Sequence, residues 1–180
     1  MRAMAEFLTD IKTIRERARA EIGKGPITDA YGADLDRVIQ VCNEALATEI
    51  VCVLRYKRHY YTATGIMAES VAAEFLEHAA EEQEHADKLA ARIVQLGGQP
   101  DLNPDTLTAR SHSQYDASPG LIEMIKEDLV AERIAIAAYT EIVQWLGDKD
   151  VTTRRLFEEL LAKEEEHADD MKSLLERMPG

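Results

Sequence analysis

The sequence predicts an all-α protein: a four-helix bundle in which a long crossover joins the second helix to the third, with a short helix in front of the bundle. Three observations carry this prediction. Apolar residues recur at helical spacing in four long segments, and a stretch rich in Pro, Ser, Asp and Asn separates the second segment from the third. One pattern, Glu-x6-Tyr followed by a loop and Glu-x-x-His-Ala-Asp, is written twice.

The first expected element is an amphipathic helix over residues 3–22, which the sequence Gly23-Lys24-Gly25-Pro26 ends. We expect residues 1–32 to form this helix and a linker. Residues 33–180 are then expected to form the bundle as one domain, because 180 residues with 46% hydrophobic content suffice for one well-buried core.

The four main helices are expected over residues 33–63, 66–96, 120–146 and from about 151 to 177. Short turns join the first to the second and the third to the fourth. Residues 97–119 contain three prolines, which predicts a long irregular crossover in place of a hairpin turn.

Two Glu-x-x-His motifs are the strongest functional signal. Glu82 and His85 form one motif, and Glu164 and His167 form the other. In a helix, a three-residue step turns by about 300° and rises by about 4.5 Å, so the carboxylate and the imidazole of each motif lie on one face. Each motif is therefore a candidate half of a metal site.

A further glutamate stands upstream of each motif. Glu49 precedes the first motif by 33 residues and Glu132 precedes the second by 32. A tyrosine, Tyr56 or Tyr139, follows each of these glutamates by seven residues, two helical turns along the same face. Either tyrosine could be an ordinary core residue, a hydrogen-bond donor to a ligand, or both.

The six residues predict a site for two metal ions. All fall on apolar stripes, where an unpaired carboxylate would be protonated or strongly destabilising. Four glutamates carry −4 and two divalent cations carry +4, so a pair of ions balances the charge. Oxygen-rich ligands with one His per ion favour iron, with manganese as the alternative, over structural zinc. Glu82 and Glu164 are the candidates to bridge the ions.

Composition limits the partners and the compartment. The net charge of −13 argues against a nucleic-acid-binding surface, and the excess of +2 in the first 24 residues is too small to change that expectation. Cys42 and Cys52 would lie about 15 Å apart on one helix, too far for a disulfide, which suggests reduced thiols in a cytoplasm. There is no secretion signal and no run of eighteen apolar residues, so no membrane association is expected.

With these motifs in place, the chain resembles the ferritin superfamily, and most closely its bacterioferritin-like branch, over residues 34–176. The resemblance implies a ferritin-like fold and a ferroxidase that uses Fe(II) with dioxygen or hydrogen peroxide. It implies that the catalytic metal ligands are Glu49, Glu82, His85, Glu132, Glu164 and His167. Tyr56 would lie beside these ligands, and Tyr139 is a second candidate for that role.

Two departures from bacterioferritin shape the expected assembly. Gln83 stands where that family places its haem-ligating Met, so haem is not expected. The chain ends thirteen residues after His167, which leaves no room for a fifth helix. With its extra N-terminal helix it is similar to Dps-like ferritins, which implies a homo-oligomeric shell, expected to be a dodecamer.

Several alternatives stay open at this point. A rubrerythrin-like peroxidase or oxidase would use the same ligands without iron storage, although no Cys-x-x-Cys pair supplies an electron donor. A metal-free helical assembly would have to explain the four buried glutamates by protonation or by pairing with basic residues, and no Lys or Arg is apparent on the inward stripes. We expect His78 to be structural, Glu77 and Glu81 to be surface charges, and His59 and His112 to be surface residues.

Overall fold

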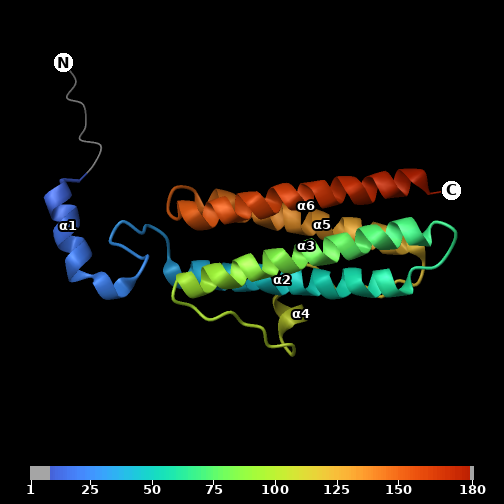
Figure 1. The fold of residues 1–180 in the computed structure, drawn as a ribbon, viewed down its shortest axis with the longest axis horizontal. Helices are drawn as coiled ribbons and strands as arrows, with labels where there is room; N and C mark the ends of the chain where they lie inside the picture. Colours follow the sequence, from blue (N-terminus) through green and yellow to red (C-terminus); the bar gives the residue numbers. More distant parts are fainter. Residues whose placement is uncertain (1–8, 179–180) are drawn as a thin grey trace, which may run out of the picture. The chain divides into compact units, whose positions relative to one another are not determined.

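The computed structural model describes residues 9–178, and the chain divides into two compact units between Gly32 and Ala33. The described residues form six α-helices and one short 3-10 helix, without a β-strand (Figure 1). The all-α prediction is therefore confirmed. None of the described helices combines the length and the apolar character needed to cross a membrane.

The first unit contains α1 (Ile11–Ala20) and the 3-10 helix η1 (Ile22–Lys24). Asp10 caps α1, because its carboxylate accepts a hydrogen bond from the Thr13 backbone N–H at 3.0 Å. The predicted helix began at residue 3, and its residues 3–8 lie outside the described part of the chain. Within the described part the helix runs over Ile11–Ala20 and buries none of its side chains.

The second unit is a four-helix bundle of α2 (Leu35–Thr62), α3 (Ala68–Gln95), α5 (Leu121–Leu146) and α6 (Val151–Arg177). Short turns connect α2 to α3 and α5 to α6, so each pair is antiparallel, and the two pairs pack through α2 against α5 and α3 against α6 (Figure 1). The predicted bundle is present, and each helix begins and ends within a few residues of its expected range.

Local sequence explains where these helices begin and end. Asp34 and Asp150 cap α2 and α6 by accepting hydrogen bonds from the backbone N–H three residues on, at 3.1 and 2.9 Å. Gly97 and Gly147 follow α3 and α5 with φ values of +84° and +48°, a region that glycine adopts without steric cost.

The crossover between α3 and α5 packs along α2 and contains one turn of helix, α4 (Leu107–Arg110), that the sequence did not predict (Figure 1). Leu107 of α4 packs against Ala47 and Val51 of α2, and hydrogen bonds add to this contact. Arg110 donates to the backbone oxygen of Asn43 at 3.1 Å, and Arg58 of α2 donates to the backbone oxygens of Ala117 and Ser118 at 2.9 and 3.2 Å. The two Arg58 bonds satisfy carbonyl groups of the crossover, which has no regular ladder of its own.

The core fills the space between the four long helices. Large apolar side chains close it above and below the level of the predicted ligands, and they are fully buried: Leu46, Phe75, Leu89, Ile93, Met124, Ile125, Leu146, Phe157, Leu160 and Met171. The predicted ligands therefore lie in an interior from which water is largely excluded.

Candidate metal centre

The bundle brings the six predicted ligand residues together from all four long helices. Glu49 comes from α2, Glu82 and His85 from α3, Glu132 from α5, and Glu164 and His167 from α6. Each is buried, with at most 4% of its surface exposed.

The six side chains form two overlapping groups. Glu49, His85, Glu82 and Glu164 make one group, and Glu132, His167, Glu82 and Glu164 make the other, with the ligand atoms of each group within 4.8 Å of one another. Glu82 and Glu164 belong to both groups. This sharing is the arrangement that two ions bridged by two carboxylates would require.

His85 shows how the first group is oriented. Its Nδ1 atom lies 3.0 Å from Glu164 Oε1, 3.4 Å from Glu49 Oε2 and 3.5 Å from Glu82 Oε2. The Nδ1 atom therefore faces a cage of carboxylate oxygens, as the donor atom of a metal-binding imidazole must.

His167 repeats this orientation in the second group. Its Nδ1 atom lies 3.3 Å from Glu82 Oε1, 3.8 Å from Glu164 Oε2 and 3.9 Å from Glu132 Oε2. Glu82 and Glu164 thus each turn one oxygen toward one histidine and the other oxygen toward the other histidine.

Buried polar atoms without hydrogen-bond partners indicate that a ligand binds at this position. Buried polar atoms are normally paired, yet among the described residues the following have no hydrogen-bond partner: both carboxylate oxygens of Glu82, one oxygen each of Glu132 and Glu164, and Nδ1 of His85 and His167. All six atoms converge on the centre of the bundle. Oxygen and imidazole donors of this kind fit two iron or manganese ions.

Without cations, protons must hold this many carboxylates together. Burial, and then the charge of Glu49, raise the pKa of Glu82 well above its ordinary value. Burial and the charge of Glu82 do the same to the pKa of Glu164. Burial opposes protonation of His85, but the carboxylates around it raise its pKa to about 12. Metal ions at neutral pH would displace these protons.

Two tyrosines brace the site across the bundle. The Tyr56 hydroxyl of α2 donates to the Glu132 carboxylate of α5, and the Tyr139 hydroxyl of α5 donates to the Glu49 carboxylate of α2. Both tyrosines are fully buried, so each is a core residue and a hydrogen-bond donor at once. Each bond fixes one carboxylate oxygen and leaves the other turned toward the histidines.

Glu81 is not the surface charge that the sequence suggested. Its Oε2 atom lies 2.7 Å from Nε2 of His167, and its Oε1 atom lies 2.9 Å from the Lys163 amine. A carboxylate in this position accepts the outer N–H of His167 and keeps Nδ1 deprotonated for a metal. In the sequence, Glu81 is visible only as the residue next to Glu82. Its contact with His167 follows from the packing of α3 against α6.

A buried charged network that the sequence analysis missed lies next to Tyr56. Arg55 Nε is 3.0 Å from Asp128 Oδ1, and His59 Nδ1 is 2.8 Å from Asp128 Oδ2. His59 is completely buried, so its expected place on the surface is wrong. Arg55 does lie inside the bundle, contrary to expectation, but it pairs with Asp128 and leaves the six predicted ligands without a basic partner. Asp128 lies one turn before Glu132 on the inward face of α5, and this position could have indicated that its carboxylate is buried.

Four other residues considered in the sequence, Gln83, His112, Cys42 and Cys52, do not belong to either ligand group. Gln83 is exposed and donates to Asp87 at 3.0 Å, and His112 is half-buried, not a surface residue. Cys42 and Cys52 are free and buried, and burial raises the pKa of the Cys42 thiol to about 12. Both thiols are therefore protonated at neutral pH.

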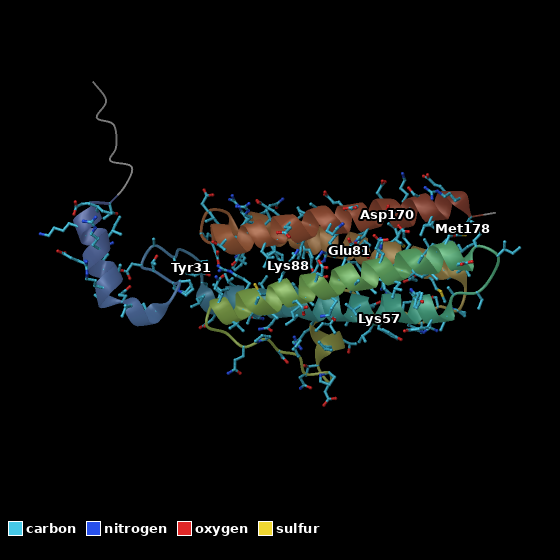
Figure 2. All side chains as sticks on the ribbon, viewed as in Figure 1. Tyr31, Lys57, Glu81, Lys88, Asp170 and Met178 are labelled. Carbon is cyan, nitrogen blue, oxygen red and sulfur yellow. The ribbon has the colours of Figure 1, made fainter. Side chains whose placement is uncertain are left out.

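One cavity adjoins the site. It has a volume of about 220 Å³ and lies between α3 and α6, lined by His85 and by charged side chains that include Glu84, Lys88 and Glu159. Lys88 bridges the seam between the two helices through Glu159 at 2.7 Å. In Figure 2, Lys88 and Glu81 lie along this same seam.

Comparison with known proteins agrees with this geometry. A ferritin-like domain family matches residues 39–180. The chain is 34% identical to a bacterioferritin from Brucella melitensis, over 78% of this chain and 83% of the relative. It is 29% identical to a DNA protection during starvation protein from Pyrococcus furiosus, over 86% of this chain and 85% of the relative.

Solved structures show the same likeness. A dodecameric thioferritin, the bacterioferritin-related protein from Bacteroides fragilis, superposes with a TM-score of 0.77 at 30% identity, over 91% of this chain and 92% of that protein. The likeness therefore spans both of the compact units, not the bundle alone.

Proposed function

Because the chain belongs to the ferritin-like family, we propose that it is a di-iron ferroxidase. It binds two Fe(II) ions per chain, oxidises them with dioxygen or hydrogen peroxide, and stores the Fe(III) in a shell built from copies of the chain. The ligands are Glu49, Glu82, His85, Glu132, Glu164 and His167.

The sharing of Glu82 and Glu164 between the two ligand groups is the observation that carries this proposal. Two carboxylates that each face both histidines hold a pair of ions close together. A pair of adjacent Fe(II) ions releases two electrons at once, which with two protons reduce dioxygen to hydrogen peroxide, or hydrogen peroxide to two waters.

The protein's own residues make that oxidation favourable. Four buried carboxylates stabilise the higher charge of Fe(III) more than that of Fe(II), and a low-dielectric interior strengthens the difference. Tyr56 and Tyr139 keep Glu132 and Glu49 in place while the charge changes. Manganese suits the same donors, so metal analysis of the purified protein decides between the two metals.

An anaerobic Fe(II) titration tests the dinuclear site. The wild type is expected to saturate near two ions per chain, and the double variant Glu82→Gln with Glu164→Gln should lose binding of both. The matched control, Glu84→Gln with Glu165→Gln, removes two exposed carboxylates from the same helices and should still bind two. Saturation at one ion, or equal losses in both double variants, rejects the proposal.

Aerobic iron loading and light scattering test storage. If the shell is a dodecamer, as in the Bacteroides fragilis relative, the scattering mass is twelve times the 20.2 kDa chain and soluble Fe(III) exceeds two ions per chain. A protein that retains only its two site ions would be a rubrerythrin-like peroxidase or oxidase instead. Gln83 and the net charge of −13 lead us to propose neither a haem nor a DNA-binding role.

A further inference from the structure

A second cluster of ligand-type side chains lies on the seam between α3 and α6, apart from the six residues of the dinuclear site. It consists of Glu74 and His78 of α3 and Asp170 of α6, with one ligand atom from each within 4.8 Å of the others. Glu74 and His78 are four residues apart, so they share one face of α3. Figure 2 labels Asp170 on α6, on this side of the bundle. We propose that these three residues form a third cation site, which takes a divalent transition-metal ion.

The orientation of His78 is the first support. Its ring is 2% exposed, and its Nδ1 atom lies 3.2 Å from the Tyr56 hydroxyl oxygen. Tyr56 has one proton, which it donates to Glu132. The Nδ1–H of His78 must therefore donate to the tyrosine oxygen, which assigns the proton to Nδ1 and leaves a lone pair on Nε2.

That lone pair points at negative charge. Nε2 of His78 lies 3.5 Å from Oδ2 of Asp170. A lone pair that faces a carboxylate is repulsive unless a cation lies between them.

The surroundings leave this negative charge largely uncompensated. Burial, and then Asp170 and Glu77, raise the pKa of Glu74, with Arg177 opposing the rise. Burial and Glu166 raise the pKa of Asp170. The nearby amine of Lys163 is already paired with Glu81 at 2.9 Å and Glu166 at 3.0 Å. A divalent cation would neutralise Glu74 and Asp170 together.

One imidazole nitrogen with two carboxylates selects the class of ion. Calcium and magnesium prefer all-oxygen sites, whereas Fe(II), Mn(II) and Zn(II) accept a mixed nitrogen and oxygen set. His78 also lies within ligand distance of Glu132 and His167, and it stacks on His167 with ring centroids 4.0 Å apart. The third ion would therefore lie beside the dinuclear centre and would take its other two ligands, Glu74 and Asp170, from outside that centre. The inference therefore goes beyond the proposed ferroxidase activity and does not depend on it.

Anomalous diffraction from crystals soaked in zinc chloride tests the site with a redox-inert ion. The wild type should show a peak about 2.0–2.2 Å from His78 Nε2 and from the carboxylates of Glu74 and Asp170. Asp170→Asn should lose this peak. Asp169→Asn, which removes the same charge from the adjacent exposed position, should keep it. A wild-type map without the peak, or an undiminished peak in Asp170→Asn, overturns the proposal.

A Zn(II) titration against a chromophoric chelator gives the same test in solution. The wild type and Asp169→Asn should each bind one ion per chain more than Asp170→Asn, and equal binding by all three proteins rejects the third site. The outcomes also separate this inference from the proposed function. A zinc peak at Glu74, His78 and Asp170 without peaks at the dinuclear site supports the third site and rejects the ferroxidase. Peaks at the dinuclear site without a peak at these three residues support the ferroxidase and reject the third site.

Discussion

The two halves of the proposed dinuclear site have the same ligand-type residues and different surroundings. The first half-site consists of Glu49, His85 and Tyr139, and the second consists of Glu132, His167 and Tyr56. In both, a tyrosine from the other helix pair holds the glutamate, and the tyrosine packs against a phenylalanine, with ring centroids 5.4 Å apart in the first and 6.0 Å in the second.

The difference lies on the outer side of the two histidines. Nε2 of His167 has a carboxylate partner in Glu81, and its ring is stacked on His78. The residues at the corresponding positions of the other repeat are Lys163 and Leu160, so His85 has neither contact and instead lines the cavity between α3 and α6. The duplicated residues place the same kinds of carboxylate and imidazole side chain in both halves. The unequal surroundings give the second half-site a fixed histidine and the first an accessible one.

The largest expected effect comes from the buried network of Arg55, His59 and Asp128, which has no counterpart in the other repeat. Arg55→Met leaves Asp128 as a buried charge without its guanidinium partner, which should cost about 3–5 kcal/mol of the free energy of unfolding, measured by urea denaturation. The corresponding residue of the other repeat is Ala138, where no such charge exists.

Lys57→Met is the control, since it removes a basic, exposed side chain from the same helix (Figure 2). A further substitution of Asp128 by Leu should recover part of the loss, because it removes the stranded charge. If Lys57→Met and Arg55→Met destabilise the protein equally, the buried Arg55–Asp128 pair does not stabilise the fold.

A smaller effect is expected from Glu81→Gln, which keeps the size of the side chain and removes its charge. The outer N–H of His167 then faces a weaker acceptor, so the affinity for one of the two ions should fall about 10–100-fold while the other is unchanged. Competition with a chelator, followed as two successive dissociation constants, measures the change.

Glu166→Gln is the matched control, because Glu166 also pairs with Lys163 but does not reach His167. Equal weakening of both ions by Glu81→Gln would mean that the half-sites are not distinguished by this carboxylate. An identical effect in Glu166→Gln would assign the loss to Lys163 instead.

The smallest expected difference separates the two tyrosines. Tyr139→Phe removes one hydrogen bond, to Glu49, whereas Tyr56→Phe leaves both Glu132 and Nδ1 of His78 without their partner. Unfolding of the metal-free proteins should therefore show Tyr56→Phe to be less stable than Tyr139→Phe by about 1 kcal/mol. Tyr61→Phe, at a position that is 79% exposed, should be close to wild type. A reversed order would mean that His78 does not depend on Tyr56.

The helices, their order and the convergence of the six ligand-type residues could be predicted from the sequence. Residues three, four and seven apart lie on one face of a helix whatever surrounds it. The sequence therefore shows that Glu82 and His85 share a face, and that Glu49 lies on the apolar face of its own helix. The duplication then related the two helix pairs. The turn α4 could not be predicted, because four residues inside an irregular crossover carry no periodic signal.

The contacts that make the half-sites unequal needed the tertiary structure. Glu81 meets His167 across 86 positions of the chain, and Arg55 meets Asp128 across 73. Both lie at the margins of their apolar stripes, where the rotation of one helix against the next decides whether a side chain faces water or a partner. The sequence by itself determined which residues can share a face; how the helices pack decided which charges are buried together, because that depends on interhelical rotation and distance, which no local pattern encodes.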